Sequence, residues 1–178
     1  MMLRFKIIGS SLFLLFVIVK VLNNTVTKNI SISEPIGYYV KLPISGKIKR
    51  GNKYLICVTS LKYIQMLKHL GLPYIRNQCP YNSPYLIKQV AGMPYDLIRI
   101  TRSGVLINNK LQQNSFGFSS AHGTKLYPLP IGYRTILGKD EYFMLGITPH
   151  SVDSRYFGIV NRNQFYKQTL LIFKENSS

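Results

Sequence analysis

From residue 23 onward, the sequence consists of short segments rich in Tyr, Ile, Val and Phe, separated by Gly and Pro. These residue types are enriched in β-strands, and frequent Gly and Pro interrupt longer elements. No internal repeat or low-complexity block is present. The pattern predicts a mostly β domain over residues 23–178. The expected strands are Gly37–Leu42, Lys53–Val58, Tyr85–Ala91, Asp96–Thr101, Val105–Ile107, Tyr142–Leu145 and Gln164–Phe173.

One short helix is expected within this series. Ser60 is a suitable N-cap, Gly71 follows the expected end of the helix, and Pro73 prevents its continuation. Between these limits, apolar residues recur at helical spacing and give a broad apolar face. By contrast, the segment Gln112–Pro130 is rich in Ser, Gly and Pro, which predicts a long connection.

The N-terminus differs in kind from the rest of the chain. Arg4 and Lys6 precede the uncharged run Ile7–Val19, and no small-x-small cleavage site follows it. We therefore interpret residues 1–22 as an uncleaved membrane anchor rather than a removed signal peptide. A helix over the apolar residues reaches about 24 Å, a little short of the roughly 30 Å hydrocarbon core, so Lys20 would extend toward the headgroups.

A buried or interfacial helix is the alternative interpretation of this run. The anchor interpretation, together with the basic N-terminal end, predicts a single-pass inner-membrane protein. Its domain of residues 23–178 would then lie on the periplasmic, extracytoplasmic side of the membrane.

The charge balance excludes several kinds of chemistry. The chain has 23 Lys and Arg residues against 6 Asp and Glu, a formal net charge of +17. The chain therefore has few acidic residues for a mechanism that needs two separated carboxylates, or for a carboxylate cage around a metal. Cys57 and Cys79 have no neighbouring His at ligand spacing, so we expect no metal site and no cofactor. The two cysteines could form one disulfide in an oxidising compartment.

A basic surface suits anionic lipid, an acidic protein partner or nucleic acid. The 13 Tyr and 9 Phe residues could stack on bases, but no aromatic-basic motif of a known nucleic-acid-binding sheet is present. We therefore expect membrane lipid as a partner, and no nucleic acid.

Two segments carry groups suited to nucleophilic catalysis. In Asn29–Tyr39, Ser31 and Ser33 alternate with Ile, so both hydroxyls would point to one face of an extended chain. In Tyr85–Asp96, Lys88 lies among apolar neighbours, where burial would lower its pKa and make it a usable base. Alternatively, the serines belong to a polar edge strand before a turn, and the lysine points outward to solvent.

A third segment, Thr148–Gly158, presents polar residues at alternating positions. Ser151, Asp153 and Arg155 alternate, as do Val152 and Ser154, which would place an Asp–Arg pair beside hydroxyl donors. A structural turn stabilised by a salt bridge explains the same pattern.

Read together and in order, these segments resemble the type I signal peptidase family of serine proteases, and more closely its conjugative-transfer branch, the TraF-type peptidases. The resemblance covers most of the chain. It comprises the N-terminal anchor, the Asn-x-Ser-x-Ser-x-Pro-x-Gly-Tyr box, Cys79-Pro80, the Lys-x-Val-Ala-Gly-x-Pro-x-Asp box, the Gly104-Val-Leu-Ile-Asn turn and the final Asp153-Ser-Arg-Tyr-Phe-Gly box.

The resemblance implies a signal-peptidase-like β domain with a Ser–Lys dyad. Ser33 is implied as the nucleophile and Lys88 as the general base. Ser31 and the backbone N–H of Ser33 are implied as the oxyanion hole. Such donors stabilise the tetrahedral anion, and losing one typically costs roughly 10²–10³ in rate.

The final box is implied to support the dyad. Ser151 matches the hydroxyl that orients the lysine, and Asp153 either orders the site or takes part in catalysis. Ser154 and Arg155 are implied as structural residues of the same box. In the TraF-like branch a cysteine pair brackets the region of the expected helix, which predicts a disulfide between Cys57 and Cys79.

Two positions depart from the family pattern. Glu34 follows the nucleophile position, where the family usually has Leu or Met, and a carboxylate there would raise the pKa of Lys88 unless it points away. Tyr95 stands where the family usually has Gly.

The resulting hypothesis is a membrane-anchored serine endopeptidase that acts on exported precursors with small residues before the cut. A pilin precursor is a plausible substrate, processed by hydrolysis or by ring closure. A second enzyme hypothesis uses Ser33, His150 and Asp153 as a conventional triad, although the latter two are only three residues apart. A third makes the protein a non-catalytic basic scaffold or binding component of a secretion or conjugation apparatus.

Overall fold

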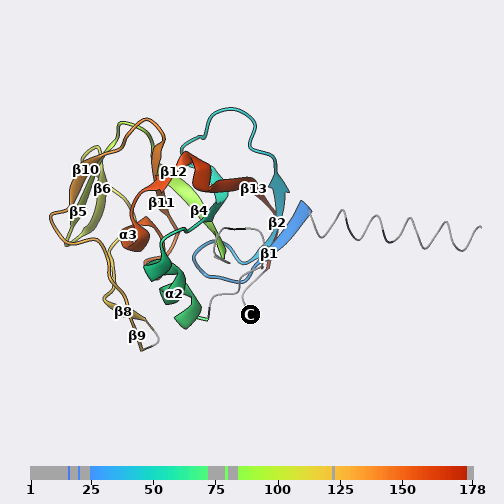
Figure 1. The fold of residues 1–178 in the computed structure, drawn as a ribbon, viewed down its shortest axis with the longest axis horizontal. Helices are drawn as coiled ribbons and strands as arrows, with labels where there is room; N and C mark the ends of the chain where they lie inside the picture. The colour runs from blue at the N-terminus through green and yellow to red at the C-terminus, as the bar shows by residue number, and fades with distance from the viewer. Residues whose placement is uncertain are drawn as a thin grey trace, which may run out of the picture.

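The computed structural model describes residues 16, 20, 25–71, 79, 84–121 and 123–175. Within these residues the chain forms a mostly β domain (Figure 1). The largest sheet is antiparallel throughout and has the order β1-β2-β13-β3-β4-β11-β12. Its strands are β1 (Val26–Asn29), β2 (Gly37–Leu42), β3 (Lys53–Cys57), β4 (Tyr85–Gly92), β11 (Glu141–Leu145), β12 (Val160–Asn161) and β13 (Phe165–Lys174).

A smaller sheet lies at the opposite end of the domain from β1 (Figure 1). It has the order β10-β5-β6-β7, and a separate hairpin is formed by β8 and β9. The seven strands expected from the sequence are all present, with ends that differ by at most one residue. The bounds are β5 (Leu97–Thr101), β6 (Gly104–Ile107), β7 (Lys110–Leu111), β8 (Ser120–Ala121), β9 (Thr124–Lys125) and β10 (Arg134–Ile136).

The expected helix is confirmed as α2 (Leu61–His69), with Ser60 at its N-cap position. The disulfide between Cys57 and Cys79 is also present, with the two Cα atoms 5.5 Å apart. It joins the end of β3 to the chain beyond α2.

Two short helical elements were not expected from the sequence. α3 covers Ser154–Phe157, and a 3₁₀-helix covers Arg162–Gln164. The sequence pattern here predicted an Asp–Arg pair, or a turn stabilised by a salt bridge, and the pair of Asp153 and Arg155 is present, with nitrogen and oxygen 2.6 Å apart. The helix itself was not expected: the Asp153 side chain accepts a hydrogen bond from the backbone N–H of Arg155 and so caps α3. The expected long connection Gln112–Pro130 is also partly wrong, since it contains the β8–β9 hairpin.

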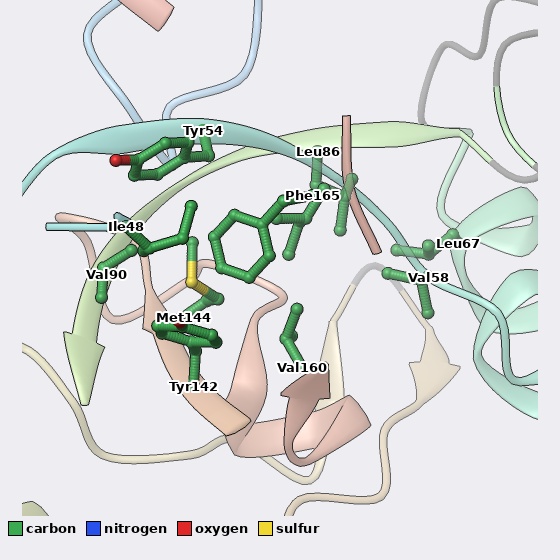
Figure 2. Packing of buried hydrophobic residues seen from close by; sticks show 11 residues of the cluster. Ile48, Tyr54, Val58, Leu67, Leu86, Val90, Tyr142, Met144, Val160 and Phe165 are labelled. Atoms are coloured by element: carbon green, nitrogen blue, oxygen red, sulfur yellow. The ribbon is translucent and has the colours of Figure 1, made fainter. Parts of the chain in front are cut away.

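The main core lies between the large sheet and α2. Figure 2 shows Phe165 of β13 among side chains from β3, β4 and β11. Its ring packs edge-on against Tyr54 and Tyr142, with centroids 5.2 and 5.0 Å away. Leu67 of α2 closes one side of the cluster. A second cluster, which includes Ile98 and Phe143, joins the two sheets, so the main strands are fixed on both faces.

Among the described residues, no helix is long and apolar enough to cross a membrane. Apart from residues 16 and 20, the expected anchor of residues 1–22 lies outside the part of the chain that the structure describes.

Candidate active site

The loop after β1 is folded around the side chain of Asn29. Its amide nitrogen Nδ2 donates hydrogen bonds to the carbonyl oxygens of Ser31, Glu34 and Pro35, at 2.9, 3.0 and 3.0 Å. Its oxygen Oδ1 accepts from the Ser31 N–H at 3.2 Å. The loop is therefore a turn held by one residue, not the extended segment that alternation of Ser and Ile predicted.

The two serines of this loop nevertheless contact each other. Ser31 Oγ and Ser33 Oγ lie 2.9 Å apart, and the Ser33 N–H points to Ser31 Oγ at 3.3 Å. Ser33 is buried, while the intervening Ile32 is exposed. The turn thus brings together the hydroxyl of Ser31 and the N–H of Ser33, the two donors expected for an oxyanion hole.

Gly146 connects this loop to the end of β11. The N–H of Ile147 donates to the Ser33 carbonyl oxygen at 2.9 Å. A Cβ added at Gly146 would lie 2.8 Å from that same oxygen and 2.5 Å from Cβ of Ser151. The absence of a side chain at Gly146 therefore lets the Ser33 loop and Ser151 approach the same point.

The pairing of β4 with β11 brings Lys88 to this point. Gln89 of β4 lies opposite Leu145 of β11, and continuing that register by one residue places Gly146 opposite Lys88. The side chain of Lys88 is only 2% exposed. The interpretation of Lys88 as an outward-facing strand lysine is therefore wrong, and Lys88, Ser33 and Ser151 converge on Gly146.

Burial sets the protonation of Lys88. Removal from water lowers the pKa of its ammonium group from 10.5 to about 8, because desolvation penalises the charged form. Asp153 and Glu34 oppose this shift of the pKa, whereas Arg155 adds to it. A substantial fraction of Lys88 is consequently neutral, and able to accept a proton, near pH 8.

The carboxylate of Asp153 is fully occupied by hydrogen bonds. Oδ1 accepts from the N–H and Nε of Arg155 at 3.1 and 2.7 Å, and Oδ2 accepts from Nη2 of Arg155 at 2.6 Å. Oδ2 also accepts from the Gly146 N–H at 2.9 Å. Ser154 Oγ accepts from the Met144 N–H at 2.9 Å. These bonds tie α3 to the end of β11 and favour an ordering role for Asp153.

Arg155 extends this network to the neighbouring loops. Its guanidinium group donates to five backbone carbonyl oxygens while it pairs with Asp153, and both side chains are buried. The acceptors are Asn114, Phe116, Thr148, Pro149 and Ser151. Arg155 is therefore the structural residue that the sequence suggested.

Two roles expected from the sequence, that of Ser151 as the hydroxyl that orients Lys88 and that of His150 in a triad, are not supported by hydrogen bonds in the described part of the chain. Ser151 Oγ is buried and makes none among the described residues, so the contact to Lys88 that an orienting hydroxyl needs is not formed. His150 stacks on Phe118, with ring centroids 4.7 Å apart, and Asp153 is engaged by Arg155 and Gly146. The described contacts therefore give the triad hypothesis no support.

Sequence reasoning missed Lys53. The Glu34 side chain is fully buried, and its Oε2 lies 2.6 Å from Lys53 Nζ. Burial raises the pKa of Glu34, while Lys53 and then Lys88 oppose that rise. The pair lies 19 residues apart in sequence, and only the sheet joins its members. The periodicity within β3 contained no signal for it.

The larger pocket lies beside this cluster. It has a volume of about 470 Å³ and lies between the turn after β5 and the loops near Phe116 and Pro128. Arg155 is part of its lining, but Ser33 and Lys88 are not. A second pocket of about 440 Å³ separates α2 from the β8–β9 hairpin. Neither pocket identifies the substrate-binding site.

Comparisons with known proteins identify the family of the chain. Residues 3–173 match the family described as "Signal peptidase, peptidase S26". Two relatives from Escherichia coli are each called plasmid transfer protein TraF. One is 28% identical over 138 residues, 76% of each chain, and the other is 27% identical over 76% of this chain and 75% of its own.

A solved structure of signal peptidase I from Enterococcus faecalis V583 is 17% identical, with a TM-score of 0.40. The alignment covers 70% of this chain and 98% of that one. The family match spans nearly the whole sequence, and both TraF proteins align with three quarters of it. The chain therefore belongs to the signal peptidase family of peptidases, as a member of the TraF type.

Proposed function

We propose that this protein is a membrane-anchored serine endopeptidase that cleaves exported precursors outside the cytoplasm with a Ser33–Lys88 dyad. The observation that carries the proposal is the burial of Lys88, with its lowered pKa, beside the glycine that contacts the Ser33 loop. Membership of a peptidase family supports it.

In the first half of the reaction, Ser33 Oγ attacks the scissile carbonyl carbon while Lys88 Nζ takes the hydroxyl proton. The negative charge that forms on the substrate oxygen accepts hydrogen bonds from the Ser33 N–H and the Ser31 hydroxyl. Without substrate, Ser31 and Ser33 contact each other, and during the reaction both donors turn to the oxyanion instead. Collapse of the intermediate breaks the C–N bond, and Lys88 returns its proton to the leaving amine.

In the second half, the acyl group on Ser33 is released. Water attacks the ester carbonyl, Lys88 accepts a proton from that water, and Ser33 leaves with a proton restored. An amine from the same substrate chain can replace water, in which case an amide bond closes a ring. Asp153 keeps Gly146 in place through its hydrogen bond to the Gly146 N–H, and exchanges no proton with the substrate. Ser151 is given no step, because its hydroxyl makes no hydrogen bond among the described residues.

The substrate class follows from the family and the TraF relatives. Signal peptidases imply a precursor with small residues before the cut, and the name "plasmid transfer protein" makes a pilin precursor the specific candidate. We place residues 1–22 in the inner membrane and the domain of residues 23–178 on the periplasmic side.

The test uses the full chain in detergent micelles and an internally quenched peptide with Ala-x-Ala before the cleaved bond. A candidate pilin precursor, analysed by mass, distinguishes a hydrolysed from a cyclic product. Ser33→Ala and Lys88→Ala should abolish cleavage of both substrates, whereas His150→Ala and the exposed control Ser119→Ala should not. Unchanged cleavage of both substrates by Ser33→Ala would refute the proposed dyad, whereas a wild-type chain that cleaves neither substrate would leave the non-catalytic scaffold.

A further inference from the structure

Glu34 places a negative charge directly beside the proposed nucleophile. It follows Ser33 in sequence, and the Asn29 side chain holds its carbonyl oxygen at 3.0 Å. Its carboxylate is fully buried. A buried carboxylate without a cation is strongly disfavoured, and near an amine it stabilises the ammonium form. The site therefore contains a group that opposes the neutral form of Lys88, which the reaction requires.

Lys53 supplies the cation that Glu34 needs. It begins β3 and lies opposite Gln89, the residue after Lys88, so its backbone is adjacent to the lysine of the dyad. Its Nζ lies 2.6 Å from Glu34 Oε2. Its side chain remains 23% exposed, so Lys53 reaches the buried carboxylate from the solvent side and keeps part of its own hydration.

The charges around Lys88 form two matched pairs. From the cap and first turn of α3, Asp153 is paired with Arg155 at 2.6 Å. From the loop after β1, Glu34 is paired with Lys53 on β3. Burial and Glu34 raise the pKa of Tyr39 on β2 to about 12, so this phenol is neutral. Each carboxylate that acts on Lys88 is thus balanced by a cation of its own.

We propose that Lys53 is a positioning residue of the dyad, whose ammonium group neutralises Glu34 and so prevents that carboxylate from holding Lys88 in its protonated form. Lys53 acts through Glu34 and touches no reacting atom. The inference rests on the proposed function, and it explains how an acidic residue is accommodated directly after the proposed nucleophile.

The direct test is an NMR titration of Lys88 in the full chain, with lysine labelled by ¹³C at Cε and the Lys88 signal assigned from its loss in Lys88→Arg. Lys53→Met should move the titration midpoint up, on the order of one pH unit, because Glu34 is no longer balanced. Glu34→Gln should move it down. The matched control Lys53→Arg keeps the charge and should titrate like the wild type.

Two further measurements separate the possible outcomes. The double variant Lys53→Met/Glu34→Gln should titrate below Lys53→Met, because the unbalanced carboxylate is gone. Equal midpoints for Lys53→Met and the wild type, or shifts of Lys53→Met and Glu34→Gln in the same direction, would overturn the inference. If Lys53→Met does not fold, an unshifted midpoint in Glu34→Gln overturns it instead.

The titration needs no substrate, so its result tests the role of Lys53 separately from the proposed function. Peptide cleavage by Ser33→Ala at the wild-type rate removes the function whatever the titration shows. If Ser33→Ala is inactive and the titration midpoints of Lys88 are unshifted, only the role proposed for Lys53 is refuted.

Discussion

The carbonyl oxygen of Ser33 accepts a hydrogen bond from the N–H of Ile147 at 2.9 Å, which fastens the proposed nucleophile's loop to the end of β11. The neighbouring Gly146 has no room for a side chain, because an added Cβ would lie 2.8 Å from the Ser33 oxygen and 2.5 Å from Ser151 Cβ. The position of Ser33 therefore depends on one glycine in a different part of the sequence.

We expect Gly146→Ala to separate the Ser33 loop from Ser151. The added methyl group should cost about 1–3 kcal/mol in the free energy of unfolding and lower kcat/KM by at least tenfold, since a small displacement of a nucleophile is costly. Chemical denaturation and peptide cleavage measure the two effects. In the control Gly138→Ala the methyl group meets only the flexible Glu141 side chain, at 3.2 Å, so equal losses in both variants would contradict the explanation.

Peptidase activity should rise with pH through about 8. Lys88 must be neutral to accept the serine proton, and its pKa of about 8 sets where the neutral form becomes dominant. Below that value, kcat/KM should fall about tenfold for each pH unit. Initial rates between pH 6 and 10 test this; a rate that is flat from pH 6 to 8 would exclude Lys88 as the base.

Replacing Lys88 by Met should stabilise the protein while abolishing cleavage. The pKa of Lys88 is about 8 in the folded protein against 10.5 for a lysine in water, so the unfolded chain binds more protons between these values, and wild-type stability should rise with pH there. The gain of Lys88→Met should be on the order of 2 kcal/mol at pH 7 and should shrink toward pH 10. Urea denaturation across this range measures it. A stability gain of Lys88→Met that grows with pH would contradict a lowered pKa of Lys88 in the folded protein.

Asp153→Asn should unfold the region around α3. The change leaves the Arg155 guanidinium group buried without its counter-ion, which typically costs about 3–5 kcal/mol. The exposed pair of Lys28 and Glu175, with nitrogen and oxygen 2.7 Å apart, is the control, and Glu175→Gln should cost less than about 1 kcal/mol. If Asp153→Asn kept wild-type stability but lost activity, Asp153 would be a catalytic rather than an ordering residue.

Tyr95 should be replaceable by Gly with a gain in stability. Its φ of 70° lies in the left-handed region, and its side chain is 71% exposed, so little packing is lost. Gly relieves a backbone strain of about 1–2 kcal/mol in the folded state. This gain should exceed the loss of about 0.4–1 kcal/mol that arises because Gly increases the conformational entropy of the unfolded chain. A rise in the thermal midpoint is expected, and a fall would show that Tyr95 makes a stabilising contact.

The main strands could be predicted from sequence because most are rich in β-branched and aromatic residues, and Gly or Pro lies next to several of them. Gly37–Leu42 was placed without error for this reason. The two-residue strands β7 (Lys110–Leu111) and β8 (Ser120–Ala121) are too short to show a period. They are set by neighbouring strands rather than by their own composition.

The candidate site was predictable where its signal was local or carried by a family motif. Ser33 and Lys88 were named from such motifs. The helix cap at Asp153 was not predicted, because alternation of polar residues also fits a side chain that caps a helix two residues on. The ion pair of Glu34 and Lys53 depends on the order of strands in the sheet, which sequence spacing does not specify.

The loop around Asn29 and the register that positions Lys88 differ in how much of the chain must be present. Every hydrogen bond that Asn29 makes to the loop spans at most six residues, so these bonds can form within a short piece of chain. Lys88 comes to lie opposite Gly146, the glycine beside the Ser33 loop, only after β4 has paired with β11, more than 50 residues further along the sequence. Such distant pairings form late in folding. Under the proposed dyad, a chain whose large sheet has not yet closed would therefore have Ser33 without its base, and would be unable to cut itself or its neighbours.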